Sequence, residues 1–239
     1  MSKLARGIYA ILDIDRLAPL LPEDPEQERA LLMRYAEAAV QGGAVALQLR
    51  DKRAPAHSLA LASLYRDLVQ AYGERVPVLM NDHLVAAQPM VGRPGVGLHV
   101  GQDDDSPVRA RAALGDDAMV GLSTHDLDQV ETARRLPIDY MGFGPVRATD
   151  GKAEAGAARG FEALAEAAAR TAKPVVAIGG LGIDDVAAIC AAGAHAMAVI
   201  GAWLGPAAKP GTPERAALQM SMLTATWQAA MEEVAAEAP

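Results

Sequence analysis

The amino-acid sequence predicts an α/β protein: a single-domain (β/α)8 barrel, or TIM barrel, in which eight parallel strands alternate with helices. Eight short apolar runs recur along the 239 residues, and Ala-rich stretches with helical spacing separate them. Each run is almost continuously apolar, as strands are when helices cover both faces of a parallel sheet. Periodicity does not show whether the sheet closes, so a doubly wound open sheet is the alternative.

The predicted strands follow these apolar runs and are, in chain order, GIYAILD (7–13), AVALQLR (44–50), PVLMND (77–82), VGLHVG (96–101), MVGLST (119–124), DYMGFGP (139–145), PVVAIGG (174–180) and AMAVIGA (196–202). No shift in composition marks a domain boundary. Residues 1–239 are therefore expected to form one domain, with the barrel over residues 7–203.

Several of the intervening stretches carry helical signals. Apolar residues recur at helical spacing in ERALLMRYAEAAVQGG (28–43) and FEALAEAAARTAK (161–173). The stretch DDVAAICAAGA (184–194) begins with acids and ends at Gly193, as a capped helix does. After a loop over 205–213, residues 213–237 predict a final helix on the outside of the barrel. Its Met and Trp residues are expected to contact the core or another subunit.

Composition and charge exclude several classes of protein. The net charge is −8 and the isoelectric point is about 5.1, which argues against general binding to nucleic acids or anionic membranes. The single cysteine, Cys190, excludes an intramolecular disulfide and fits a reducing compartment. The N-terminus lacks the pattern of a signal peptide, and no apolar run is long enough for a transmembrane helix. We therefore expect a cytoplasmic protein.

Polar residues of functional type collect at the carboxyl ends of the predicted strands. Because these ends meet at one mouth of a barrel, where such folds keep their active sites, the residues are expected to lie together. Each one alone is more often a turn, capping or solvent-exposed residue, and only the joint pattern indicates a site. The residues are Gln48, Arg50, Lys52, Asn81, Asp82, His99, Asp104, Ser123, Thr149, Lys152, Gly180, Ile200 and Gly201.

The chemistry of these residues predicts two anionic groups at the mouth. Backbone N–H groups in VAIGG (176–180) and VIGA (199–202) would hold a monophosphate, since glycine lets an anion approach the backbone closely. Elsewhere on the rim, three cations stand beside two carboxylates that would repel a bare anion. A Mg²⁺ ion between the carboxylates and a diphosphate removes this conflict. The cations are Arg50, Lys52 and Lys152, and the carboxylates are Asp82 and Asp104.

From about residue 7 to 203, the sequence resembles thiamine phosphate synthases. The resemblance is carried by LQLRDK (47–52), ND (81–82), GLHVGQDD (97–104), GLSTHDLDQV (121–130), GPVRATDGK (144–152), VVAIGGL (175–181) and AVIGA (198–202). It implies a transferase that joins an aminopyrimidine, supplied as its diphosphate, to a thiazole phosphate. The products are thiamine phosphate and pyrophosphate, and Mg²⁺ assists the departure of pyrophosphate. A homodimer is compatible with the family.

The resemblance also implies roles for the residues that match. Asp82 and Asp104 hold Mg²⁺, while Gln48 and His99 orient the pyrimidine. Ser123 contacts the reacting region and the pyrophosphate, and Thr149 contacts the thiazole phosphate or its loop. Gly180, Ile200 and Gly201 cradle that phosphate through backbone groups. The diphosphate is held by Arg50, Lys52, Asn81 and Lys152, and the catalytic residues are Arg50, Lys52, Ser123 and Lys152.

The chain departs from the family pattern in the loop after the sixth strand. Gly151 stands where the family has a second threonine, and Arg147 stands where it has an aromatic residue. Gly201 replaces a serine often found there. We hypothesise that the Arg147 cation compensates for the lost hydroxyl, and we expect residues 147–160 to close over the substrates as a lid.

Two other functions are open from the sequence. A related barrel, the thiazole tautomerase, uses a histidine after the fifth strand as its acid and base, and His125 stands in that neighbourhood. A non-catalytic paralogue that binds thiamine phosphates is the second. Neither needs the diphosphate and Mg²⁺ residues, all of which are present, so the synthase is favoured.

Overall fold

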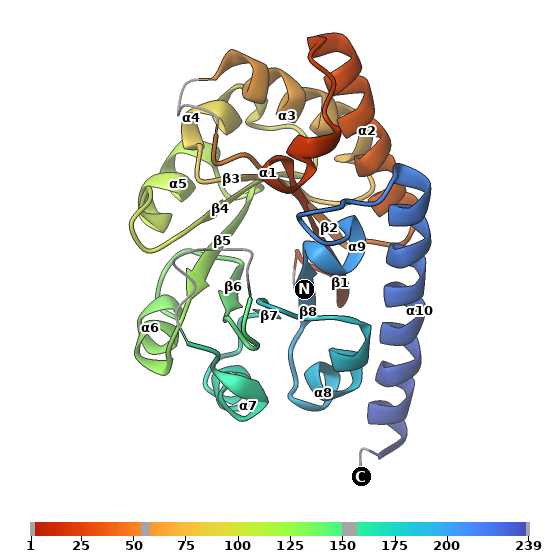
Figure 1. The fold of residues 1–239 in the computed structure, drawn as a ribbon. Helices are drawn as coiled ribbons and strands as arrows, with labels where there is room; N and C mark the ends of the chain where they lie inside the picture. Colours follow the sequence, from red (N-terminus) through yellow and green to blue (C-terminus); the bar gives the residue numbers. More distant parts are fainter. Residues whose placement is uncertain (1–2, 54–57, 150–156, 238–239) are drawn as a thin grey trace.

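The computed structural model describes residues 3–53, 58–149 and 157–237. Eight parallel strands pair in chain order, and β1 pairs with both β2 and β8, which closes the sheet into a barrel (Figure 1). The predicted TIM barrel is therefore confirmed, and the open sheet is excluded. The strands are β1 (Gly7–Asp13), β2 (Ala46–Arg50), β3 (Val78–Asn81), β4 (Val96–Val100), β5 (Met119–Thr124), β6 (Tyr140–Phe143), β7 (Val175–Ala177) and β8 (Ala196–Val199).

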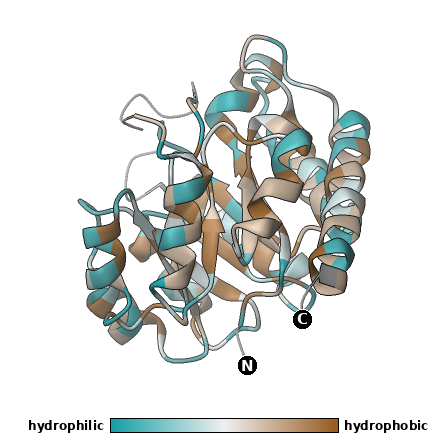
Figure 2. Cartoon of the chain, turned by 90° about the horizontal axis from the view of Figure 1, so that it is seen from below, coloured by the Kyte–Doolittle hydropathy of each residue, from teal (hydrophilic) through white to brown (hydrophobic). Residues whose placement is uncertain are grey.

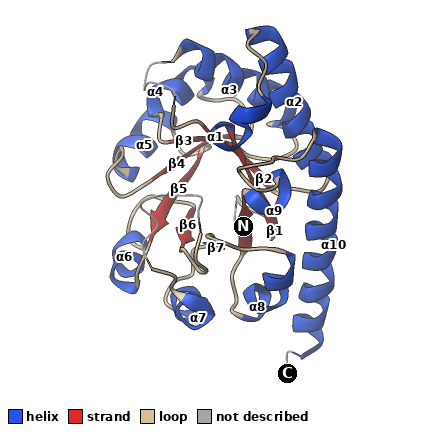
Figure 3. Ribbon diagram, in the orientation of Figure 1, coloured by secondary structure: helices blue, strands red, loops and turns tan. Residues whose placement is uncertain are grey.

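Helices connect the strands and surround them on the outside (Figure 3). Several begin at a side chain that accepts a hydrogen bond from a backbone N–H of the first turn, as Asp24, Ser58, Ser106 and Asp126 do. The α-helices are α1 (Ile14–Leu17), α2 (Pro25–Gln41), α3 (Leu59–Tyr72), α4 (Leu84–Ala87), α5 (Pro107–Leu114), α6 (Leu127–Ala133), α7 (Gly160–Ala169), α8 (Val186–Ala191), α9 (Gly201–Leu204) and α10 (Pro213–Glu237). Short 3-10 helices are η1 (Ala18–Leu20), η2 (Gln88–Met90) and η3 (Ile183–Asp185).

The predicted ends of two strands are wrong in a way that matters for the mouth. The predicted seventh strand ran to Gly180, but β7 ends at Ala177, because Gly179 and Gly180 have positive φ angles of 102° and 64°. The predicted eighth strand ran to residue 202, but β8 ends at Val199 and Gly201 begins α9. Both differences leave glycine backbone at the carboxyl end of the barrel, outside the sheet.

Both faces of the strands are buried, which explains their continuous apolar runs. Tyr9 and Ile11 of β1 point into the barrel and belong to a small interior cluster with Leu4 and Leu79. Their neighbours on β1 belong to the large outer core that the helices cover. In Figure 2 the strands are mostly brown and enclosed by helices that carry teal as well. Successive residues of a strand therefore alternate between the core inside the barrel and the core between the barrel and its helices.

The final helix packs on the outside of the barrel, as predicted. Figure 1 shows α10 running beside α2 and α8, and the contacts of these helices agree. Met220 and Trp227 are buried in the outer core, whereas Met222 is exposed. No helix in the described parts of the chain combines the length and the apolar character that a membrane span requires.

Candidate active site at the carboxyl end of the barrel

A cavity of about 420 Å³ lies at the carboxyl ends of β5 to β8. It brings together five of the predicted site residues: Ser123, Thr149, Gly180, Ile200 and Gly201. Gln48, Arg50 and His99 line a smaller pocket of about 20 Å³ in the barrel interior, which shares Ser123 with the large cavity. The two spaces therefore adjoin along a shared wall, to which Ser123 contributes a hydroxyl group; the other shared residues are Gly142, Ile178, Ala198 and Ile200.

The interior pocket contains a chain of hydrogen bonds that runs across the barrel. The Gln48 side-chain amide donates to the Tyr9 hydroxyl at 2.9 Å, and the Tyr9 and Tyr140 hydroxyls lie 2.9 Å apart. Tyr140 lies 2.8 Å from His99 Nδ1, and His99 Nε2 lies 2.9 Å from Ser123 Oγ. Gln48, His99 and Ser123 were predicted from the sequence, but the two tyrosines were not, because each resembles an apolar strand residue.

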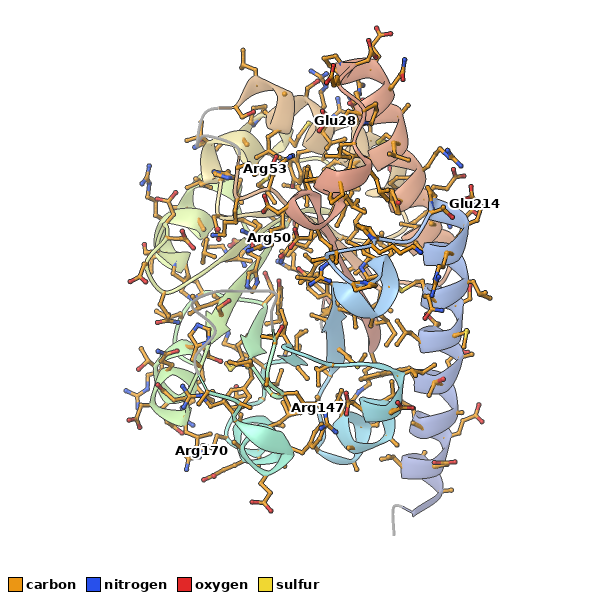
Figure 4. The ribbon with its side chains drawn as sticks, in the orientation of Figure 1. Glu28, Arg50, Arg53, Arg147, Arg170 and Glu214 are labelled. Carbon is orange, nitrogen blue, oxygen red and sulfur yellow. The ribbon has the colours of Figure 1, made fainter. Side chains whose placement is uncertain are left out.

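Arg50 is buried and forms an ion pair inside the barrel mouth (Figure 4). Its Nη1 lies 2.6 Å from Asp13 Oδ2 and 3.5 Å from Asp15 Oδ2. Asp13 also caps α1, because its Oδ1 accepts a hydrogen bond from Arg16 N at 3.0 Å. Asp13 was not predicted as a site residue, although a carboxylate at the end of an apolar strand was a usable signal. In this arrangement Arg50 already has two carboxylate partners.

Asp82 is the centre of a second polar cluster on the rim. Its Oδ2 accepts hydrogen bonds from Lys52 Nζ at 2.5 Å and from Asn81 Nδ2 at 2.6 Å. Asp82 has a positive φ of 63°, which turns its side chain out of the line of β3. It also shares a hydrogen bond with Asp104, which follows β4. The fold therefore assembles these four predicted residues into one group.

The two carboxylates of this cluster have opposite pKa shifts. Burial raises the pKa of Asp82 above its usual value, against the lowering by the hydrogen bond from Lys52. Burial also acts to raise the pKa of Asp104, but hydrogen bonds from Asp82 and from the Gly101 N–H outweigh it and lower this pKa. Two carboxylates close enough to share a proton can instead share a divalent cation. Among the described residues, no group of three or more His, Cys, Asp or Glu side chains is arranged to bind a metal.

The large cavity is bordered partly by glycine backbone where the loops after β7 and β8 line it. A Cβ atom on Gly180 would lie 2.2 Å from the Ala148 carbonyl oxygen, so only glycine fits there. A Cβ atom on Gly201 would lie 3.2 Å from Arg16 Nη1, which places this guanidinium group over the start of α9. Arg16 Nη1 also donates to the Gly205 carbonyl at 2.9 Å. Arg16 was not predicted as a site residue, because no local motif marks it.

Arg147 does not line the cavity, and about half of its side chain is exposed to solvent, at 53%. Its Nε lies 2.6 Å from Asp185 Oδ1, and its guanidinium group lies 5.0 Å from the centre of the Phe161 ring. Figure 4 shows it near α7 and α8, away from Arg50. The idea that Arg147 compensates for a lost hydroxyl stays a prediction. Lys152 and Gly151 lie outside the described residues, as does much of the predicted 147–160 lid.

His125 lines the large cavity, as the tautomerase alternative requires. Its Nδ1 lies 2.8 Å from the Gly144 carbonyl oxygen, and its backbone N–H donates to Gln129 Oε1 at 2.8 Å. Since a carbonyl only accepts, Nδ1 carries the hydrogen and Nε2 is the basic nitrogen. His125 is therefore anchored at the turn between β5 and α6.

Comparisons with known proteins agree with this geometry. Residues 21–203 match the thiamine monophosphate synthase family. The thiamine-phosphate synthase of Anaeromyxobacter dehalogenans is 46% identical over 186 residues, which cover 77% of this chain and 79% of that protein. That of Azorhizobium caulinodans is 42% identical over 176 residues, which cover 73% and 80%. The solved thiamine phosphate pyrophosphorylase of Pyrococcus furiosus has a TM-score of 0.70 at 25% identity, and the match covers 96% of this chain and 98% of that one. The chain therefore belongs to the thiamine monophosphate synthase family.

Proposed function

We propose that this protein is a thiamine phosphate synthase. It joins 4-amino-2-methyl-5-hydroxymethylpyrimidine diphosphate to 4-methyl-5-(2-hydroxyethyl)thiazole phosphate and releases pyrophosphate. The observation that carries the proposal is that the interior pocket and the glycine-bordered cavity share a wall, which includes the Ser123 hydroxyl group. Two substrates bound on either side of this wall would meet beside Ser123 and His99, whose side chains lie 2.9 Å apart.

The rim cluster suits the diphosphate of the first substrate. Asp82 and Asp104 would hold Mg²⁺, which supplies positive charge to the phosphate oxygens when it is bound. Lys52 is half exposed, so its ammonium group can turn from Asp82 to the diphosphate. Negative charge grows on the leaving group in the transition state, and cations fixed nearby stabilise that state more than the ground state. Arg50 and Lys152 complete this set of cations.

The chain supplies no protein nucleophile in this mechanism. The aminopyrimidine stabilises the cation that forms when pyrophosphate departs, and the thiazole nitrogen then attacks it. Gln48 and His99 orient the pyrimidine, and the cavity holds the thiazole in line. The attack of the thiazole nitrogen on the cation therefore depends on the positioning of the two reactants and on the exclusion of water.

The thiazole phosphate is expected to bind at Gly180, Ile200 and Gly201, with Thr149 beside it. Arg16 stands over Gly201 and adds a guanidinium group to these backbone contacts. A guanidinium forms charge-assisted hydrogen bonds to phosphate oxygens. Arg16 thereby offers a contact in place of the hydroxyl that a serine at position 201 would bring.

Replacement of Arg16 by glutamine is expected to raise KM for the thiazole phosphate about tenfold, because a hydrogen bond to a charged group contributes about 1.5 kcal/mol or more. KM for the pyrimidine diphosphate should stay within about twofold of the wild-type value. Steady-state kinetics with each substrate varied in turn measures both constants. Arg134→Gln is the matched control, because Arg134 is exposed and pairs with Glu131 at the end of α6. Equal rises in the two KM values would contradict a phosphate contact.

The function itself is tested with both substrates, with and without Mg²⁺. We expect equal amounts of thiamine phosphate, measured as thiochrome fluorescence, and pyrophosphate, and we expect both to need the metal. A tautomerase would consume its thiazole substrate without pyrophosphate, and a binding paralogue would turn nothing over. No pyrophosphate from the complete mixture would therefore refute the proposal.

Location and assembly are part of the same proposal. The buried Cys190 fits a reducing cytoplasm. A homodimer would cover exposed apolar side chains of α10, Leu218 and Met222. We expect the partners of the site to be its two small-molecule substrates.

A further inference from the structure

The hydrogen-bond chain in the barrel interior has a direction, which follows from counting donors. Gln48 Nε2 is a donor only, so the Tyr9 oxygen accepts from it. Tyr9 is 1% exposed, and its single hydroxyl hydrogen must go to its other neighbour, the Tyr140 oxygen. Tyr140 is equally buried and passes its own hydrogen to His99 Nδ1. Each hydroxyl in the chain therefore accepts one hydrogen bond and donates one.

The direction of these hydrogen bonds determines the tautomer of His99. An imidazole whose Nδ1 accepts a hydrogen bond carries its hydrogen on Nε2, so His99 Nε2 donates to Ser123 Oγ at 2.9 Å. Ser123 Oγ accepts that bond and keeps its own hydrogen for a group in the large cavity, which Ser123 lines. With the opposite direction, the serine hydrogen would point back to His99, and Ser123 would present only lone pairs to an anion.

The barrel is shaped to hold this chain. A Cβ atom on Gly121 would lie 2.1 Å from Tyr140 Cζ, so the tyrosine ring occupies the space that any other residue at position 121 would fill. The Tyr140 ring stacks on His99 and meets Tyr9 edge to face. Burial raises the pKa of both tyrosines above the usual value, so both keep their hydrogens at neutral pH.

We propose that Tyr9 and Tyr140 are positioning residues, which hold His99 in the Nε2–H tautomer and thereby direct the Ser123 hydroxyl hydrogen toward a phosphate oxygen of the departing diphosphate. The proposal rests on the proposed synthase function for the identity of that anion. Both tyrosines line the interior pocket, but each hydroxyl hydrogen is used within the chain of hydrogen bonds and is not offered to a substrate. Each acts through His99 and Ser123, and so contributes to the rate more than to binding.

The tautomer is tested directly by nuclear magnetic resonance on ¹⁵N-labelled protein. Correlations from the ring protons identify which nitrogen of each imidazole is protonated, and a His99→Asn variant assigns the signal among the five histidines. We expect the Nε2–H form in the wild type and a mixture of tautomers in Tyr140→Phe. This measurement needs no turnover, so it stands even if the synthase assay fails. A wild-type His99 with its hydrogen on Nδ1 would overturn the proposal.

Kinetics test the effect on catalysis. Tyr140→Phe is expected to lower kcat about tenfold, and Ser123→Ala about 100-fold, with KM values within about twofold of wild type. If Tyr140 acts through Ser123, the kcat of the double variant should lie within about twofold of that of Ser123→Ala. If the two residues act independently, the double variant should lose about 1,000-fold in kcat.

The matched control is Tyr65→Phe. Tyr65 is also fully buried, and its hydroxyl bonds to the Val78 and Gly97 carbonyls at 3.1 and 3.0 Å, outside this chain. The Tyr65→Phe variant should be destabilised as Tyr140→Phe is, but it should keep the wild-type kcat. Equal loss of kcat in the two variants, or a fully additive double variant, would show that Tyr140 is only structural.

Discussion

Replacement of Asp82 by asparagine is expected to lower kcat/KM by about 100-fold or more, the range seen when one charge-stabilising group is removed from an active site. Asparagine keeps the size of the side chain and tolerates the positive φ of 63° at this position. It can still accept a hydrogen bond from Lys52 and donate one to Asp104. What it lacks is the negative charge that a Mg²⁺ ion requires.

The measurement is kcat/KM across a series of Mg²⁺ concentrations, with the free energy of unfolding as the test of fold. The variant should need more Mg²⁺ for half-maximal activity and should unfold within about 1 kcal/mol of the wild type. Asp105→Asn is the control, since Asp105 lies beside Asp104 but pairs with Arg109. An unchanged Mg²⁺ dependence in Asp82→Asn would remove Asp82 from the metal site.

Replacement of Arg50 by methionine should reduce both activity and stability. The Asp13 side chain is 5% exposed and would lose its closest cationic partner. Removing one partner of a buried ion pair costs about 3–5 kcal/mol, because the other charge is left uncompensated. Loss of a cation beside the diphosphate should lower kcat/KM about 100-fold as well. Urea unfolding and turnover measure the two effects separately.

A second variant separates these two roles of Arg50. In Arg50→Met/Asp13→Asn the buried charge is gone, and asparagine can still cap α1 by accepting from Arg16 N. We expect most of the lost stability to return while activity stays low. If the double variant is no more stable than the single one, the loss comes from packing. If either variant turns over normally, Arg50 is not part of the site.

Much of the barrel was predictable because its signals are local. Continuous apolar runs predicted the eight strands. The acidic start and final glycine of residues 184–194 predicted one helix, which the structure shows as α8 preceded by the short η3. The ends of β7 and β8 were not predictable, because an apolar run continues through Ile178 and Ile200 after the ladder has ended. Strand ends depend on which residues find a partner in the neighbouring strand, and the sequence of one strand does not contain that information.

In the candidate site, too, some features were predicted from the sequence and others were not. Lys52, Asn81, Asp82 and Asp104 were predicted to meet, and they form one hydrogen-bonded cluster. The partners of the predicted residues were not predicted: Asp13 for Arg50, and Tyr140 for His99. Arg16 was missed for a similar reason, since its position over Gly201 depends on how α1 and α9 approach each other.

By itself, the sequence determined the eight strands, the helical connections and the end of the strands at which polar residues gather. Those properties arise from side-chain periodicity within a few residues and from the rule that parallel strands end on the same side. Only the tertiary structure decided which polar groups are paired. Tyr9 and Tyr140 are 131 residues apart, and Asp13 and Arg50 are 37 apart. Closure of the barrel sets such pairings, because it places strands at a fixed register and excludes the water that would otherwise satisfy each polar group alone.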